Sequence, residues 1–142
     1  MVRRDVARTR IGRATTWLVD AEALFGADDE TFRAATRDRD LAIFYLFLAL
    51  QECIDLAAHW VADAGWGVPD DAGSTFDTLA DRGAIARDLA DSLRQGVGLR
   101  NRIAHGYALL DYSRVRAEGL AGIPALKSFL AAVGREAEMQ PE

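Results

Sequence analysis

The chain has 142 residues, of which 50% are hydrophobic and 27% are charged, and its formal net charge at pH 7 is −5. This size and composition predict one soluble globular domain over residues 1–142. Proteins that coat nucleic acid through bulk charge are usually basic, so the acidic balance argues against that class but not against an enzyme with a small basic site. Cys53 is the only cysteine, which excludes an intramolecular disulfide.

The sequence indicates a helical protein of the cytoplasm. It has only 3 prolines, long segments rich in Ala, Leu, Arg and Asp, and no alternating Val/Ile/Thr runs, which together predict an all-α fold. The charged N-terminus is not followed by the apolar segment of a signal peptide. The most apolar run, residues 41–50, is far shorter than the roughly 20 residues that cross a bilayer, so we expect no membrane insertion.

Residues 2–24 are expected to form the first helix. An apolar stripe follows one face, and arginines fill the other faces in a pattern typical of a solvated surface. Gly26 is expected to end this helix, and Asp28 or Asp29 to cap the next one. The stripe comprises Val6, Ile11, Ala14, Leu18 and Ala21.

Residues 30–64 are predicted to form the longest helix, with a kink near residues 36–39. Its central part is apolar on two faces, and each apolar face needs a cover. The bundle core covers one face, and we expect a dimer interface to cover the other. One face carries Leu41, Phe44, Tyr45 and Leu48, and the other carries Ile43, Phe47, Leu50, Ile54, Ala57 and Val61.

Asp55 and His59 lie four residues apart on this long helix. We interpret them as a carboxylate that holds a histidine across one helical turn. Helical di-metal sites use Glu-x-x-His pairs on two helices, and this chain contains no such pair. We therefore predict neither a metal site nor a cofactor.

A turn-rich loop at residues 65–73 precedes a short helix. Ser74 is expected to cap this helix over residues 75–81, with Asp77 in the capping-box position. The next helix starts near Ala84, and Gly96 and Gly98 within it predict a close approach of another segment or a local irregularity.

The last helix follows residue 110. Asp111 or Ser113 is expected to cap it, and Pro124 to kink or restart it.

Residues 98–107, Gly-Leu-Arg-Asn-Arg-Ile-Ala-His-Gly-Tyr, concentrate the groups capable of chemistry. At 100° per residue, Asn101 and His105 lie about 40° apart on the helix, whereas Arg100 and His105 lie about 140° apart. Gly106 is expected to end the helix, which frees Tyr107 and places His105 at the C-terminus, where a positive charge is favoured.

This combination of residues suits phosphodiester chemistry. Arginine binds phosphate through two hydrogen bonds, and histidine can take the proton of a ribose 2′-OH or give one to the leaving oxygen. No metal is needed when the 2′-OH is the nucleophile, and a symmetric dimer would supply a second histidine. The spacing alone leaves a structural alternative open, in which Arg and His complement the helix dipole and Tyr107 packs.

The stretch resembles the signature of the HEPN superfamily, an arginine followed four to six residues later by a histidine. Here Arg100 and His105 enclose four residues, and the polar Asn101 follows the arginine directly. The extension through Gly106 to Tyr107 resembles the Arg-x4-His-x-Tyr form of HepT toxins, which pair with the nucleotidyltransferase antitoxin MntA. Residues 39–46, 51–59, 75–80 and 98–102 resemble that family in order and spacing. The family commonly carries Glu or Asp at Gly106, so this departure bears on the local acid/base balance.

The resemblance implies a HEPN-like antiparallel bundle of about five helices and a homodimer whose two motifs face each other across an RNA-cleaving cleft. It implies catalytic roles for Arg100 and His105, a supporting role for Asn101, and AMP transfer from ATP to Tyr107 by the antitoxin. Arg102 is left as an RNA contact or a packing contact. The resulting prediction is a metal-independent endoribonuclease toxin. The alternative is a non-catalytic helical dimer that binds a nucleotidyltransferase partner or a nucleotide.

Overall fold

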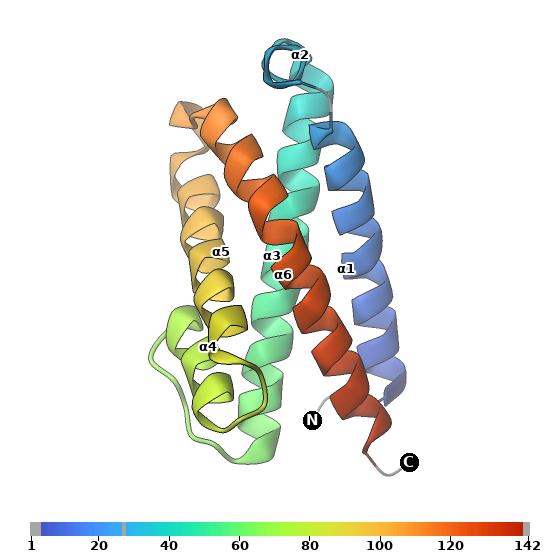
Figure 1. Cartoon of the computed structure of the whole chain (residues 1–142), viewed down its shortest axis with the longest axis vertical. Coiled ribbons are helices and arrows are strands. Elements are labelled where there is room, and N and C mark those ends of the chain that lie inside the picture. The colour runs from blue at the N-terminus through green and yellow to red at the C-terminus, as the bar shows by residue number, and fades with distance from the viewer. Residues whose placement is uncertain (1–3, 27, 141–142) are drawn as a thin grey trace.

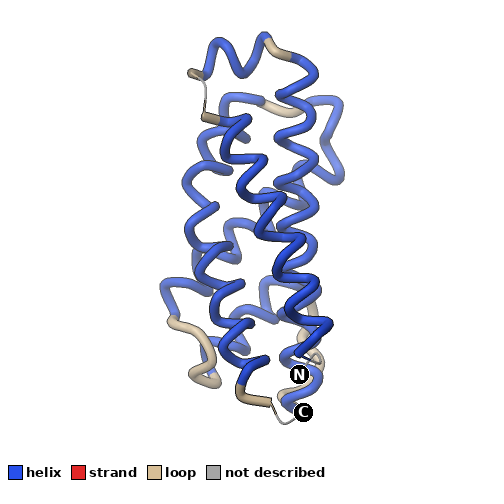
Figure 2. Tube along the Cα trace, turned by 90° about the vertical axis from the view of Figure 1, so that its right-hand side faces the viewer, coloured by secondary structure: helices blue, strands red, loops and turns tan. Residues whose placement is uncertain are grey.

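The computed structural model describes residues 4–26 and 28–140, and it confirms the all-α fold. No strand occurs within these two ranges (Figure 2). They contain six α-helices and one short 3₁₀ helix, η1. The elements are α1 Arg4–Phe25, α2 Asp29–Ala34, α3 Thr36–Ala64, α4 Ala72–Asp81, α5 Arg87–Gly106, η1 Tyr107–Leu109 and α6 Tyr112–Glu138.

The four long helices α1, α3, α5 and α6 run alternately up and down in an antiparallel bundle (Figure 1). α2 lies across one end of the bundle, and α4 packs against α5 at the other end. The start of α1 lies beside the end of α6, where Arg4 donates a hydrogen bond of 3.0 Å to the carbonyl of Glu138. The buried side chains form one continuous core, whose largest members are Phe25, Phe32, Phe76 and Phe129.

α3 is the central helix of this bundle and contacts α1, α4, α5 and α6. It is long and apolar enough to cross a membrane by length and composition, but half of its apolar window is buried inside the bundle. That burial is typical of the core helix of a soluble protein. The two predicted apolar faces differ in environment, because Ile43 and Leu50 are buried whereas Phe44 is 52% exposed.

The predicted long helix is in fact two helices. Ala35, with φ −85° and ψ 71°, leaves the helical region and separates α2 from α3, next to the predicted kink. The bundle therefore has six α-helices within the described ranges instead of about five.

The predicted restart at Pro124 is wrong, since α6 continues through this residue. Pro124 is exposed, so water can bind the carbonyl that loses its helical partner.

The cap of α4 also differs from the prediction. Asp71, and not Ser74, is the N-cap, and its Oδ1 accepts a hydrogen bond of 2.8 Å from the backbone N–H of Ser74. Two other predicted caps are confirmed, because Asp28 accepts from the N–H of Thr31 and Asp111 from that of Arg114.

The start of α5 lies three residues later than expected. Gly83, with φ 74°, forms a left-handed turn, so residues 84 and 85 belong to the connection and the helix begins at Arg87. The predicted close approach is found at Gly96, where a Cβ atom would lie 3.1 Å from Cδ2 of Leu50. At Gly98 a Cβ atom would meet no atom within 4 Å.

Candidate active site

α5 separates an apolar inner face from a polar outer face. Ala90, Leu93, Leu99 and Ile103 are buried against the bundle and fix the rotation of the helix. The outer face is defined here as Arg100, Asn101, Ala104 and His105. Three of these residues are exposed and Arg100 is half-buried. The predicted catalytic residues therefore lie together on the solvent side of one helix.

Arg100 points toward α3. Its Nη1 donates a hydrogen bond of 2.9 Å to Oε1 of Gln51, while its Nε is buried and has no hydrogen-bond partner among the described residues. Arg100 lines a pocket of about 330 Å³ between α5 and the start of α4, together with Arg94 and Asn101. The arginine is thus anchored through Nη1, its Nε is buried, and its Nη2 is left for a ligand.

His105 lies in the last turn of α5, as expected, and is exposed. It lines a different pocket, of about 510 Å³, which continues along Leu109, Leu110 and the start of α6. Asn101 lines both pockets. Within one chain, therefore, Arg100 and His105 open into neighbouring pockets that share Asn101, and they do not converge on one cavity.

Tyr107 lies at the other end of the outer face, beside the start of α3. α5 ends at Gly106 as predicted, and Tyr107 begins η1 with 45% of its surface exposed. Partial burial raises the pKa of the Tyr107 hydroxyl, and the nearby Asp40 and Tyr112 raise it further, whereas Arg39 opposes them. The side chain of Tyr107 is therefore partly accessible, and its hydroxyl is protonated at neutral pH.

Arg102 turns away from the outer face toward α6. Its Nη2 forms an ion pair with Glu118, which also accepts a hydrogen bond of 2.9 Å from Nε of Arg114. Burial and the neighbouring Arg114 lower the pKa of Arg102. Sequence reasoning did not find Glu118 as its partner, because the two residues lie 16 positions apart on different helices.

The predicted contact between Asp55 and His59 is wrong. The Oδ1 atom of Asp55 accepts a hydrogen bond of 3.1 Å from Nε2 of Gln51, and its Oδ2 lies 3.7 Å from Nη2 of Arg10. His59 is exposed and forms no hydrogen bond or ion pair with any residue in the described ranges. Asp55 thus interacts one turn back along α3 instead of one turn ahead, because Arg10 of α1 supplies a charged partner.

Gln51 is a hydrogen-bond partner of the candidate site that sequence reasoning missed. A signal was present, since Gln51 and Asp55 stand four residues apart on one helix. Its contact to Arg100, 49 positions away, becomes visible only when α3 and α5 are placed side by side. Within the described part of the chain, no group of three or more His, Cys, Asp or Glu side chains has the geometry to hold a metal ion.

Comparison with known proteins shows the family of this chain. The family described as "Ribonuclease HepT-like" matches residues 16–133. The mRNA nuclease HepT of Shewanella oneidensis is 28% identical over 107 residues, which cover 75% of this chain and 80% of that protein.

Solved structures show the same fold. The tri-AMPylated HEPN toxin of Shewanella oneidensis in complex with its MNT antitoxin is 24% identical, with a TM-score of 0.82 over 92% of this chain and 98% of that one. The cytosolic protein YutE of Bacillus subtilis, of unknown function, is 18% identical, with a TM-score of 0.75 over 95% of this chain and 94% of that one. With a family match that spans both pockets and most of the bundle, the chain belongs to the HepT-like ribonuclease family.

Proposed function

We propose that this protein is a metal-independent endoribonuclease toxin of the cytoplasm, neutralised by a MntA-like nucleotidyltransferase antitoxin. The observation that carries the proposal is the outer face of α5, where Arg100 and His105 open into neighbouring pockets joined by Asn101. Family membership and the relative named mRNA nuclease HepT support RNA as the substrate.

The chemistry uses the 2′-OH of the RNA as the nucleophile. His105 takes the 2′-OH proton while the 2′ oxygen attacks phosphorus, and the bond from phosphorus to the 5′ oxygen breaks. Arg100 binds the phosphate oxygens and stabilises the negative charge that develops on them. Asn101, between the two pockets, orients the phosphate. The products are a 2′,3′-cyclic phosphate and a free 5′-OH, so the departing 5′ oxygen must receive a proton.

A homodimer supplies that second proton-transfer group. If the outer faces of two α5 helices pair around a two-fold axis, the partner's His105 can protonate the 5′ oxygen, and each Arg100 gains a histidine opposite. The exposed side chain of Phe44 supports this arrangement. Phe44 is 52% exposed and lies on the same face of α3 as Asp40 and Gln51. Asp40 is near Tyr107, and Gln51 binds Arg100, so this face borders the site. A second copy would cover this apolar side chain.

Modification of Tyr107 explains the control of such an enzyme. The Tyr107 oxygen attacks the α-phosphorus of ATP, the bond between the α- and β-phosphates breaks, pyrophosphate leaves, and a base of the antitoxin accepts the phenol proton. The exposure of Tyr107 makes it accessible to an enzyme. An added AMP would place negative charge on the face to which RNA phosphates bind, and would thereby exclude RNA. The similar toxin that is tri-AMPylated in complex with its MNT antitoxin supports this partner and this modification.

Cleavage of a single-stranded RNA by the purified, unmodified protein in the presence of EDTA tests the proposal. His105→Ala and Arg100→Ala should each abolish cleavage. Tyr107→Phe should still cleave RNA, and mass spectrometry should show that the antitoxin does not add AMP to it. His59→Ala is the matched control, since His59 is the other histidine, is exposed and should be dispensable. Full cleavage by His105→Ala would overturn the assignment. Intact RNA with unmodified wild type would favour the non-catalytic dimer.

The dimer is tested by Phe44→Lys. This variant should elute as a monomer, keep its helical circular dichroism and lose cleavage. Val19→Lys on α1 is the control, because Val19 is equally 52% exposed but lies on another helix. If Phe44→Lys still forms a dimer and cleaves RNA at the wild-type rate, the dimer interface does not include Phe44.

A further inference from the structure

A chain of polar contacts leads from Arg100 into the bundle. Nη1 of Arg100 donates to Oε1 of Gln51 at 2.9 Å, and Nε2 of Gln51 donates to Oδ1 of Asp55 at 3.1 Å. The Oδ2 atom of Asp55 lies 3.7 Å from Nη2 of Arg10, and Nε of Arg10 binds the buried Glu52. Three helices, α1, α3 and α5, thus meet through side chains that end at the candidate active site.

The orientation of the Gln51 amide follows from its two partners. A guanidinium group can only donate, so it must face the amide oxygen, and a carboxylate can only accept, so it must face the amide nitrogen. Asp55 therefore fixes which end of Gln51 is presented to Arg100. Asp55 is itself held by Arg10, whose side chain is only 17% exposed.

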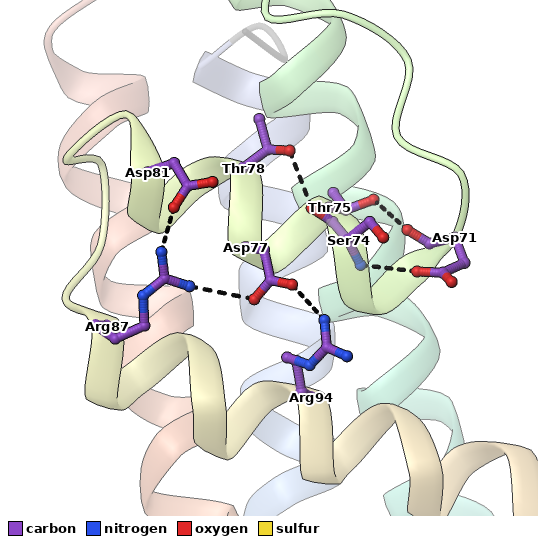
Figure 3. Close-up of polar contacts among 8 residues, drawn as sticks. All are labelled: Asp71, Ser74, Thr75, Asp77, Thr78, Asp81, Arg87 and Arg94. Atoms are coloured by element: carbon purple, nitrogen blue, oxygen red, sulfur yellow. Dashed lines mark hydrogen bonds and ion pairs between the residues drawn. The ribbon is translucent and has the colours of Figure 1, made fainter.

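Gln51 also leaves the charge of Arg100 uncompensated. The neighbouring arginines of α5 have carboxylate partners, since Arg102 binds Glu118 and Arg94 binds Asp77 (Figure 3 shows the latter). Asp77 also binds Arg87, so the start of α5 is held to α4 by this carboxylate. The hydrogen-bond partner of Arg100 in the described ranges is a neutral amide. An arginine held by a neutral group keeps its full attraction for an anion.

We propose that Gln51, oriented by Asp55, is a positioning residue that holds the Arg100 guanidinium in place while leaving its charge free for the RNA phosphate. This inference rests on the proposed function, because it assigns Arg100 to the phosphate. Nη1 is bound to Gln51 and Nε is buried, so Nη2 is the nitrogen of Arg100 that is left for a phosphate oxygen.

The test compares Gln51→Glu with Gln51→Ala. Glutamate keeps the contact to Arg100 but adds a negative charge that competes with phosphate. Alanine keeps the charge of Arg100 free but removes its anchor. Binding of a single-stranded RNA oligonucleotide is measured at several salt concentrations in the His105→Ala background, so that RNA stays intact. Gln51→Glu should reduce the slope of log affinity against log salt by about 0.7 per site, whereas Gln51→Ala should leave the slope unchanged.

The second measurement is the kcat and KM of RNA cleavage by variants that keep His105. Gln51→Ala should lower kcat by about tenfold to a hundredfold with little change in KM, because a displaced guanidinium no longer meets the developing charge. Asp55→Asn should lower kcat less, because an asparagine can accept or donate and so permits both orientations of Gln51. Gln95→Ala, an exposed glutamine on α5, is the control and should match wild type. Thermal unfolding shows that each variant is folded.

The outcomes separate this inference from the proposed function. If Arg100→Ala retains cleavage, the proposed function fails. If Arg100→Ala is inactive but Gln51→Glu keeps both the wild-type salt slope and the wild-type kcat, only the role of Gln51 is overturned. If Gln51→Ala fails to fold, Gln51→Glu and Asp55→Asn still decide the question.

Discussion

Arg102 of α5 forms an ion pair with Glu118 of α6, and this contact ties the end of α5 to α6. The pair is part of a small network, because Glu118 also binds Arg114. Arg100, two residues earlier, has no carboxylate partner in the described part of the chain and lines the pocket that also holds Arg94 and Asn101.

Arg102→Met should therefore affect stability more than cleavage. The side chains of Arg102 and Glu118 are 39% and 36% exposed, so solvent screens the pair and its loss should cost no more than about 1 kcal/mol of unfolding free energy. Chemical denaturation gives the stability, and an RNA cleavage assay gives the activity. A loss of RNA affinity with unchanged stability would instead identify Arg102 as the RNA contact considered from the sequence.

The phenol of Tyr107 should titrate above its ordinary pKa near 10. Because the folded-state pKa is raised, the folded chain keeps this proton at pH values where the unfolded chain has lost it. The stabilisation is complete below the unfolded value and is lost as the pH rises through the folded value. Asp40→Asn should move the Tyr107 pKa back toward the ordinary value, since it removes a nearby negative charge. The difference in phenolate absorbance between each protein and its Tyr107→Phe form isolates this titration, and an unchanged midpoint would refute the role of Asp40.

A structural feature can be predicted from the sequence when it depends on residues that are neighbours along the chain. Helical periodicity and the caps at Asp28 and Asp111 depend on neighbours along the chain, and these predictions are confirmed. The end of α5 at Gly106 is likewise local. The break at Ala35 was placed only approximately, because alanine favours a helix and only the packing of α2 across the end of the bundle requires a turn there.

The contacts of the site are not local. The carboxylate of Asp55 could bind His59 on its own helix, but Gln51 and Arg10 bind it instead once α1 and α5 pack against α3. In the same way, helical periodicity predicts the separation of about 140° between Arg100 and His105. It does not predict that Asn101 lines both of their pockets. Such partners depend on interhelical packing, which one-dimensional spacing does not contain.

Arg39 should contribute to stability through its position at the junction of three helices. Its guanidinium donates to Asp40 at 3.0 Å and to the carbonyl of Arg33 at 3.1 Å, and it lies 3.9 Å from the ring centre of Tyr112. Its side chain is only 14% exposed, so we expect Arg39→Ala to cost about 1–3 kcal/mol of unfolding free energy. Urea denaturation measures this loss. Arg37→Ala, an exposed arginine two residues earlier, is the control, and an equal effect of the two changes would contradict the specific role of Arg39.

Asp71 should stabilise α4 in a pH-dependent way. Hydrogen bonds from Ser74 lower the pKa of Asp71, so the stabilisation is present above the unfolded value near 3.8 and is lost as the pH falls through the lower folded value. Asp71→Ala should therefore destabilise the protein at pH 7, and the difference from wild type should shrink in acid. Ser74→Ala should have the smaller effect at pH 7, because the Ser74 backbone N–H, which alanine keeps, makes the capping bond. A larger loss from Ser74→Ala would restore the cap expected from the sequence.

Two glycines one turn apart on α6 should respond oppositely to alanine. A Cβ atom at Gly119 would lie 3.0 Å from Cδ2 of Leu46 and 3.3 Å from the ring of Phe25, and both neighbours are fully enclosed in the core. At Gly122 a Cβ atom would meet nothing within 4 Å. Gly122→Ala should therefore raise the unfolding free energy by about 0.5–1 kcal/mol through helix propensity alone. Gly119→Ala should lower it by about 1 kcal/mol or more, since overpacking outweighs the same propensity gain. Denaturant midpoints of the two variants against wild type provide the measurement, and stabilisation by both changes would show that Leu46 and Phe25 can shift without cost.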